Sequence, residues 1–243
     1  MWELYDSLLD EIPSYLKVES AFVGNYWTVV TADNGNMGVA MTTNLTTLPP
    51  QSAGYVGQTL RDVGSLVRSW NLIEAGIGMA AINAWYNSSG RLEALGSRQK
   101  DDRYCTFDIP VEGKKIVKVG HIRHRHGVFD LADSVVTLER SPMNGEYPDS
   151  ACEYMIPESD IVLITGSAFI NKTMPRLLQL AAGKTVIITG PSTPMAPQLF
   201  RFGVSRLAGM IVANRDGMMD FTGTGFPGTP YLYGERFCLS NLK

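Results

Sequence analysis

Five short apolar runs set the strongest constraint on how the second half of this chain can fold. They are rich in valine, isoleucine and leucine, and they lie at residues 114–121, 134–140, 160–166, 184–190 and 208–214. The stretches between them favour helices at 127–133, 171–182 and 194–203. Apolar strands that alternate with helices are typical of a parallel sheet covered on both faces. The pattern therefore predicts a Rossmann-like, doubly wound parallel-sheet domain.

The first half of the chain follows a different pattern. A helix, three antiparallel strands and two further helices are expected at 2–15, 18–24, 26–32, 37–43, 58–70 and 72–87. The last of these helices is almost entirely small and apolar, so it should be buried on most sides. A meander with helices is an α+β domain. A polar stretch begins at about residue 88, which places the first domain at 1–100 and the second at 101–243.

Composition excludes several classes of partner. The formal net charge of −3 gives no general attraction to nucleic acid, and no stretch reaches the roughly 20 apolar residues of a membrane span. The N-terminus is acidic and lacks the order of a signal peptide. The three cysteines form no C-x-x-C pair and are expected to be free thiols. These features predict a cytoplasmic protein that binds neither nucleic acid nor membrane.

The first predicted strand of the second domain ends in a basic loop rather than a dinucleotide motif. A dinucleotide-binding domain would place G-x-G-x-x-G here, but this chain has Gly120, then histidines and arginines. Glu139 does lie 19 residues after Gly120, where such domains carry a ribose-binding acid. With only one of the two features present, NAD or FAD binding is disfavoured.

Two later turns resemble each other and supply candidate ligand-binding groups. Thr165-Gly166-Ser167 and Gly190-Pro191-Ser192-Thr193 each follow an apolar strand. Their glycines can adopt positive φ and turn amides inward, while their hydroxyls add further donors. Such a nest suits a carboxylate or phosphate, although the same residues are also good turn formers. Ligand binding and a purely structural turn are about equally favoured.

All three histidines lie in the basic loop, at His121, His124 and His126, with Arg123 and Arg125 between them. Three imidazoles could hold a transition metal such as Ni, Cu, Zn or Fe. The arginine charges oppose a bare cation but favour an anion or an anionic chelate. A solvated loop without function is the third interpretation. Binding of an anion or an anionic chelate is favoured, and direct metal ligation and a solvated loop stay open as interpretations.

Four segments resemble a family of bacterial and archaeal proteins described as "putative heavy-metal chelation" proteins. They are GNYWTVVTADNGNMGVAMT, GIGMAAINAW, DIVLITGSAFINKTMPRLLQLA and VIITGPSTPMAPQLFRFGVSRLAGMIV. The resemblance implies an enolase-N-terminal-like α+β domain followed by a Rossmann-like domain, with a ligand cleft between them. It also implies that the turn after the first Rossmann strand, the two Thr-Gly turns and Asn83 line that cleft. The histidines and arginines within that turn, HIRHRH, are not part of the family pattern.

The leading hypothesis is a two-domain protein that binds a small anionic ligand or metal chelate in the interdomain cleft. The expected ligand-binding residues are Asn83, Gly120, His121, Glu139, Thr165, Gly166, Ser167, Gly190, Pro191, Ser192 and Thr193, with His121, His124 and His126 contacting the metal or the anion. The alternative is a transferase or lyase that acts on a pterin, tetrapyrrole or nucleoside derivative. A non-catalytic oligomeric scaffold is a third hypothesis, and a homo-oligomer is left open.

Overall fold

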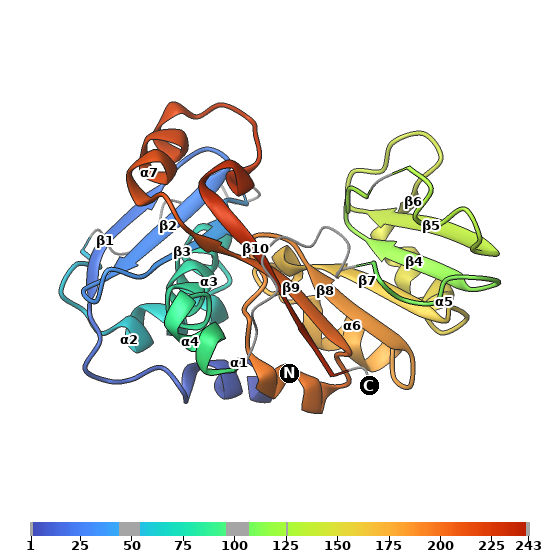
Figure 1. The fold of residues 1–243 in the computed structure, drawn as a ribbon, viewed down its shortest axis with the longest axis horizontal. Coiled ribbons are helices and arrows are strands. Elements are labelled where there is room, and N and C mark those ends of the chain that lie inside the picture. The colour runs from blue at the N-terminus through green and yellow to red at the C-terminus, as the bar shows by residue number, and fades with distance from the viewer. Residues whose placement is uncertain (1, 44–53, 96–106, 125, 242–243) are drawn as a thin grey trace.

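A computed structural model of the 243-residue chain describes residues 2–43, 54–95, 107–124 and 126–241. It contains two sheets, which Figure 1 shows side by side with helices packed around them. The predicted combination of a small antiparallel sheet with a mostly parallel sheet flanked by helices is confirmed.

The larger sheet has seven strands in the order β10-β9-β8-β7-β4-β5-β6. Their bounds are β4 Lys115–Val119, β5 Ser134–Glu139, β6 Tyr147–Pro148, β7 Ile161–Thr165, β8 Thr185–Thr189, β9 Arg206–Val212 and β10 Gly234–Ser240. Every neighbouring pair is parallel except β9 and β10. All five predicted strands are present, whereas β6 and β10 were not predicted.

The direction of winding changes between β4 and β7. From β4 the chain adds β5 and β6 on one side, and it then returns to place β7, β8 and β9 on the other. The ends of β4 and β7 therefore flank the switch point, where open α/β sheets bind their ligands. Val119 and Thr165 are the last residues of these two strands.

Both faces of the large sheet are covered. Short helices follow its strands: η2 Asp149–Ala151, α5 Cys152–Met155, η3 Gly166–Ala168, α6 Met174–Leu180 and η4 Pro197–Phe202. On the opposite face, Phe129 packs against Ile116 and Leu163. The helix predicted at 127–133 is wrong, because Gly127 takes a φ of 88° and the segment forms successive turns around Phe129.

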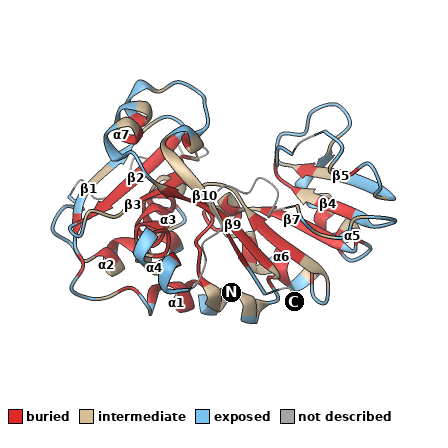
Figure 2. Ribbon diagram, viewed as in Figure 1, coloured by how far each residue is buried: buried red, intermediate tan, exposed pale blue. Residues whose placement is uncertain are grey.

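The small sheet is the predicted antiparallel meander of β1 Val18–Val23, β2 Trp27–Ala32 and β3 Met37–Met41. The helices of this half are α1 Trp2–Leu9, α2 Leu60–Ser65, η1 Leu66–Arg68, α3 Leu72–Tyr86 and α4 Ser89–Ala94. As predicted, α3 is buried along nearly its whole length (Figure 2). Gly38 of β3 allows this packing, because a Cβ there would lie 2.1 Å from the carbonyl oxygen of Ala80.

The chain returns to the small sheet after β9. Helix α7 Arg215–Thr224 and the turn η5 Pro230–Tyr233 precede β10, and α7 lies beside β1 and β2 in Figure 1. Met218 of α7 joins Trp27 and Val29 in a buried cluster. The aromatic C-terminal segment thus packs against the first half of the chain, and the domain boundary near residue 100 stays a prediction.

One large core cluster includes side chains from both halves of the molecule. Tyr5 of α1, for example, donates a hydrogen bond to the backbone carbonyl of Phe169, at 3.0 Å. None of the described helices is long and apolar enough to cross a membrane.

The cysteines only partly follow the sequence-based expectation. Cys152 is a buried free thiol, as predicted. Cys238 is disulfide-bonded, so the prediction of a free thiol is wrong there. Because disulfides are typical of oxidising compartments, the cysteines no longer support a reducing compartment. The cytoplasmic location stays a prediction.

Candidate functional site

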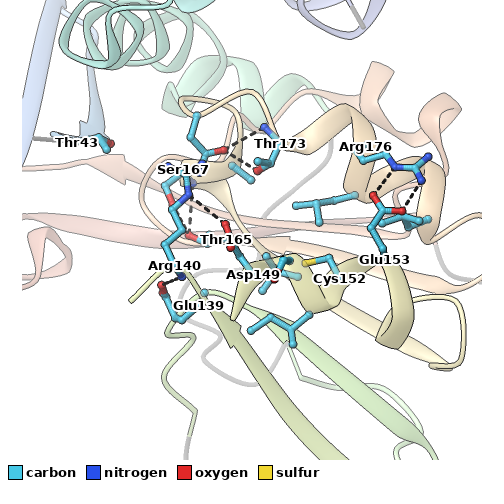
Figure 3. Close-up of a pocket in the computed structure, with 18 of the residues that line it drawn as sticks. Thr43, Glu139, Arg140, Asp149, Cys152, Glu153, Thr165, Ser167, Thr173 and Arg176 are labelled. Carbon is cyan, nitrogen blue, oxygen red and sulfur yellow. Dashed lines mark hydrogen bonds and ion pairs between the residues drawn. The ribbon is translucent and has the colours of Figure 1, made fainter. Parts of the chain in front are cut away.

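A cavity of about 310 Å³ opens at the carboxyl ends of β4, β5 and β7 (Figure 3). It lies at the switch point of the large sheet. Its walls come from those strand ends, from η2, α5 and α6, and from Met41 and Thr43 at the end of β3. The first half of the chain therefore also reaches this cavity.

Apolar side chains form much of the cavity wall. Leu138, Ala168, Leu177 and Leu180 line it together with Cys152. Burial raises the pKa of the Cys152 thiol to about 11. The thiol is therefore neutral near pH 7 and behaves as a small apolar group rather than as a nucleophile.

Hydroxyl and amide groups gather beside this apolar wall. The hydroxyls of Thr165 and Ser167 are hydrogen-bonded to each other at 3.0 Å. The Asn171 side chain accepts hydrogen bonds from the hydroxyl of Thr173 at 2.6 Å and from its amide at 3.1 Å. Four short polar side chains whose orientations are fixed by these hydrogen bonds can thus contact a ligand in the cavity.

The charged groups of the cavity are arranged in pairs. Arg140 Nε lies 3.5 Å from Asp149 Oδ2, and the Arg176 guanidinium donates two hydrogen bonds to the Glu153 carboxylate. With Glu139, the lining carries three carboxylates and two guanidiniums. Because each arginine faces a carboxylate, an anionic ligand would have to compete with those existing pairs.

Glu139 is held at the end of β5 by two backbone amides. The amide of His121 donates to its Oε1 at 3.1 Å, and the amide of Arg140 donates to its Oε2 at 2.8 Å. The imidazole Nδ1 of His121 also lies 3.5 Å from Oε1. Glu139 therefore connects the first turn of the large sheet with the cavity.

The three histidines that were expected to act together have different surroundings in the structure. His121 lies between two carboxylates, with Nε2 2.9 Å from Glu146. His124 packs on Phe129 with a ring-centroid distance of 4.6 Å, and His126 is exposed. Within the described part of the chain, no group of three or more His, Cys, Asp or Glu side chains is arranged to hold a metal ion. Metal ligation by these histidines stays a prediction, and Arg125 lies outside the described residues.

The contacts of Glu146 predict a measurable pH effect. Its pKa is lowered, first by the hydrogen bond from the backbone amide of Met143 and then by the bond to His121. The carboxylate therefore stabilises the fold above its unfolded-state pKa, and this contribution is lost as the pH falls through the lower folded-state pKa. A carbon-detected NMR titration should place the pKa of Glu146 below the ordinary range for glutamate.

The His121→Ala variant separates the two causes of this shift. The variant should raise the pKa of Glu146 without restoring the ordinary value, because the Met143 bond remains. An unchanged Glu146 pKa in this variant would contradict the assigned contact.

The two Thr-Gly turns pack against each other more closely than the sequence indicates. Gly190 has a φ of 115°, as an inward-facing turn requires, but Gly166 does not adopt positive φ. A Cβ on Gly166 would lie 2.6 Å from the backbone nitrogen of Thr193. The Thr193 amide donates to the carbonyl of Gly190 at 3.0 Å, so this amide is already used within the turn.

Ser192, Thr193 and Asn83 lie in a buried junction between the two halves. The Ser192 hydroxyl accepts a hydrogen bond from the amide of Met41 at 2.9 Å, and the Asn83 side chain donates to the carbonyl of Val39 at 2.8 Å. The structure thus brings four predicted residues to the cavity wall, namely Gly120, Glu139, Thr165 and Ser167. The buried residues Asn83, Ser192 and Thr193 do not line the cavity, and neither do His121, Gly166, Gly190 and Pro191.

Several cavity residues were missed in the sequence. Asp149, Cys152 and Arg176 are brought to the strand ends by η2, α5 and α6. These short elements carry no recognisable motif. Arg140 could have been found, because it directly follows Glu139 at the end of a predicted strand.

Comparison with known proteins identifies the family. Two family descriptions match, both reading "Putative heavy-metal chelation": DUF364 over residues 106–231 and DUF4213 over residues 5–86. The chain belongs to the DUF364 family. A crystal structure of a family member of unknown function from Desulfitobacterium hafniense is 32% identical, with a TM-score of 0.91, over 99% of each chain.

Two more distant relatives are similar to this chain over most of its length. A DUF364 family protein of unknown function from Pyrococcus horikoshii shares the fold, with a TM-score of 0.79 at 23% identity over 98% of this chain and 99% of that one. An uncharacterised protein of Methanocaldococcus jannaschii is 28% identical over 227 residues, which cover 86% of this chain and 84% of that one. The two family matches and the Desulfitobacterium hafniense structure confirm, at the level of the family, the resemblance seen in the four sequence segments.

Proposed function

We propose that this DUF364 protein binds a small organic metal chelator, or its metal chelate, in the cavity at the switch point. The observation that carries the proposal is the position of this cavity, which lies where doubly wound sheets bind ligands and is lined by apolar side chains with a few oriented polar groups. The family description supplies the chemical class of the ligand.

The geometry favours an organic ligand over a bare ion. Bound metals need several converging ligands, and the described residues hold no such group of three. Hydroxyls of Thr165 and Ser167, with the carboxylate of Glu139, suit the polar edge of an organic molecule. A metal would then be carried by the chelator, and His121 contacts Glu139 of the cavity lining.

Blocking the cavity tests this proposal. Ser150 is exposed at the cavity lining, so Ser150→Trp should fill the opening with little effect on the core. Calorimetric titrations would use Ni, Cu, Zn and Fe ions, each alone and as a preformed complex with citrate or with a pterin. We expect at least one complex to bind the wild-type chain, and Ser150→Trp to weaken that binding at least tenfold.

Two control variants make the result interpretable. Ser141→Trp introduces the same ring at an exposed position outside the cavity lining and should bind like the wild type. A triple His121, His124 and His126 to alanine variant tests the histidines, and identical binding curves would remove them from the site. Unchanged binding by Ser150→Trp, or binding of bare ions alone, would overturn the proposal.

An enzymatic role is the alternative, and one contact favours it. The imidazole of His121 lies beside the carboxylate of Glu139 at the cavity wall, which is an arrangement that can serve general acid–base chemistry. A transferase or lyase acting on a pterin, tetrapyrrole or nucleoside derivative should bind that substrate without any metal. Thermal-shift measurements with such compounds in the presence of a strong chelator separate the two functions.

A further inference from the structure

The parallel part of the large sheet has the strand order of the dinucleotide-binding fold. Without the antiparallel edge strand β10, its strands read β6-β5-β4-β7-β8-β9 across the sheet. Counted along the chain, this order is 3-2-1-4-5-6. In that fold, a carboxylate soon after the first turn hydrogen-bonds a ribose hydroxyl. The second parallel strand here is β5, and it ends at Glu139.

The Glu139 carboxylate can accept further hydrogen bonds from a ligand. It lines the cavity, and each of its oxygens already accepts one backbone amide, from His121 and from Arg140. A carboxylate offers about four acceptor sites, so Oε2 can accept one more donor. Oε1 can also accept one more when His121 Nδ1, which lies 3.5 Å from it, carries no proton. The two amides fix the plane of the carboxylate, which prepares it to receive two neighbouring hydroxyl groups.

One wall of the cavity is apolar and can contact the face of a nucleobase. Leu138, Ala168 and Leu177 line it, and the neutral thiol of Cys152 adds to this surface. The cavity volume of about 310 Å³ lies at the lower end of the range of about 300–1,000 Å³ for small-molecule sites. This is room for one base and one sugar rather than for a dinucleotide.

The first turn lacks the features that hold a pyrophosphate. Phosphates bind there through a glycine-rich loop and the N-terminus of the following helix. The part of the loop that is described, at 120–124 and 126–133, forms turns but no helix. A Cβ on Gly120 would lie 2.8 Å from Cγ2 of Thr165, so this glycine is used for packing between β4 and β7.

From this geometry we propose that the cavity binds a nucleoside, with Glu139 accepting hydrogen bonds from the ribose 2′ and 3′ hydroxyls. The base lies against the apolar wall. This inference rests on the alternative, enzymatic function proposed for the same cavity, because a nucleoside derivative would bind there without any metal. The cavity would thus keep the ribose-binding carboxylate of a dinucleotide site but lack its pyrophosphate-binding loop. NAD and FAD are therefore not the preferred ligands.

Removing single hydroxyls from the ligand tests the inference on the wild-type chain. Adenosine, guanosine, cytidine and uridine would each be titrated by calorimetry, and the tightest binder compared with its 2′-deoxy and 3′-deoxy forms. We expect each deoxy form to bind at least tenfold more weakly, and NAD to bind more weakly than adenosine. Equal affinity for the deoxy forms, or failure of all four ribonucleosides to bind, would overturn the inference.

The Glu139→Gln variant adds a second test. It should lose at least tenfold in affinity for the ribonucleoside while keeping the wild-type affinity for the 2′,3′-dideoxy form. Glu158→Gln, at an exposed position outside the cavity lining, is the matched control and should bind like the wild type. If Glu139→Gln fails to fold, the comparison of the ribonucleoside with its deoxy forms on the wild-type chain still tests the inference.

The chelate proposal and the nucleoside inference can fail separately. Chelates that bind and are blocked by Ser150→Trp, together with ribonucleosides that do not bind, would overturn the nucleoside inference alone. If neither chelates nor ribonucleosides bind, both proposals fail.

Discussion

Replacing Gly38 with alanine is expected to lower the free energy of unfolding by about 3 kcal/mol. The new Cβ would lie 2.1 Å from the carbonyl oxygen of Ala80 and 2.2 Å from the backbone nitrogen of Ala84. Both are backbone atoms of α3, a buried helix that cannot shift without disturbing the core on its other sides. Urea denaturation of the variant and the wild type measures the difference.

Gly223→Ala is the matched control for this substitution. Gly223 lies within α7, and a Cβ there would meet no atom within 4 Å. Alanine is favoured over glycine in a helix, but Gly223 is the last residue but one of α7, so the control should gain at most about 0.5 kcal/mol. A Gly38→Ala variant as stable as the wild type would show that α3 does not pack on β3 in this way.

Replacing Asn87 with alanine is expected to lower the free energy of unfolding by about 3 kcal/mol. It should also loosen the segment from Thr193 to Met195. The Asn87 side chain donates to the carbonyl of Thr193 and accepts from the amide of Met195, both at 2.9 Å. Asn87 is 2% exposed, so its removal leaves two buried backbone groups without their partner. Hydrogen exchange should become faster at the Met195 amide, in addition to the loss of stability.

The effect of Asn87→Ala should also reach the ligand site. Thr193 packs against Gly166, which directly follows Thr165 of the cavity wall. Asn144→Ala, at an exposed turn position, is the control and should change stability by less than about 0.5 kcal/mol. Unaltered hydrogen exchange at Met195 would argue against the assigned bonds.

The fold was largely predictable because its central strands are continuous apolar runs. β7 and β8, for example, are buried on both faces, which demands valine, isoleucine and leucine at almost every position. β10 was not predicted, because it is an edge strand with few apolar residues and gains its pairing only from β9. The helix predicted at 127–133 failed for a local reason, since Gly127 favours a turn and Phe129 is drawn into the core.

The candidate site was predictable only where it depends on strand ends. Gly120, Glu139 and Thr165 follow from the rule that ligands bind at the carboxyl ends of parallel strands. Arg176 and Cys152 could not be found, because their place at the cavity depends on how α5 and α6 pack on the sheet. The histidines appeared to form one group in the sequence, but the structure gives His121 two carboxylate partners and His124 an aromatic one.

Methyl NMR of the wild-type chain during ligand titration tests most directly whether the switch-point cavity is the binding site. The ligands would be adenosine and the metal–citrate and metal–pterin complexes. We predict that the methyl signals of Leu138, Leu177 and Leu180 shift with saturation, while those of Leu60 and Leu199, which are buried outside the cavity lining, stay in place. Shifts that arise elsewhere and spare all three cavity leucines, or no shift with any of these ligands, would contradict the account.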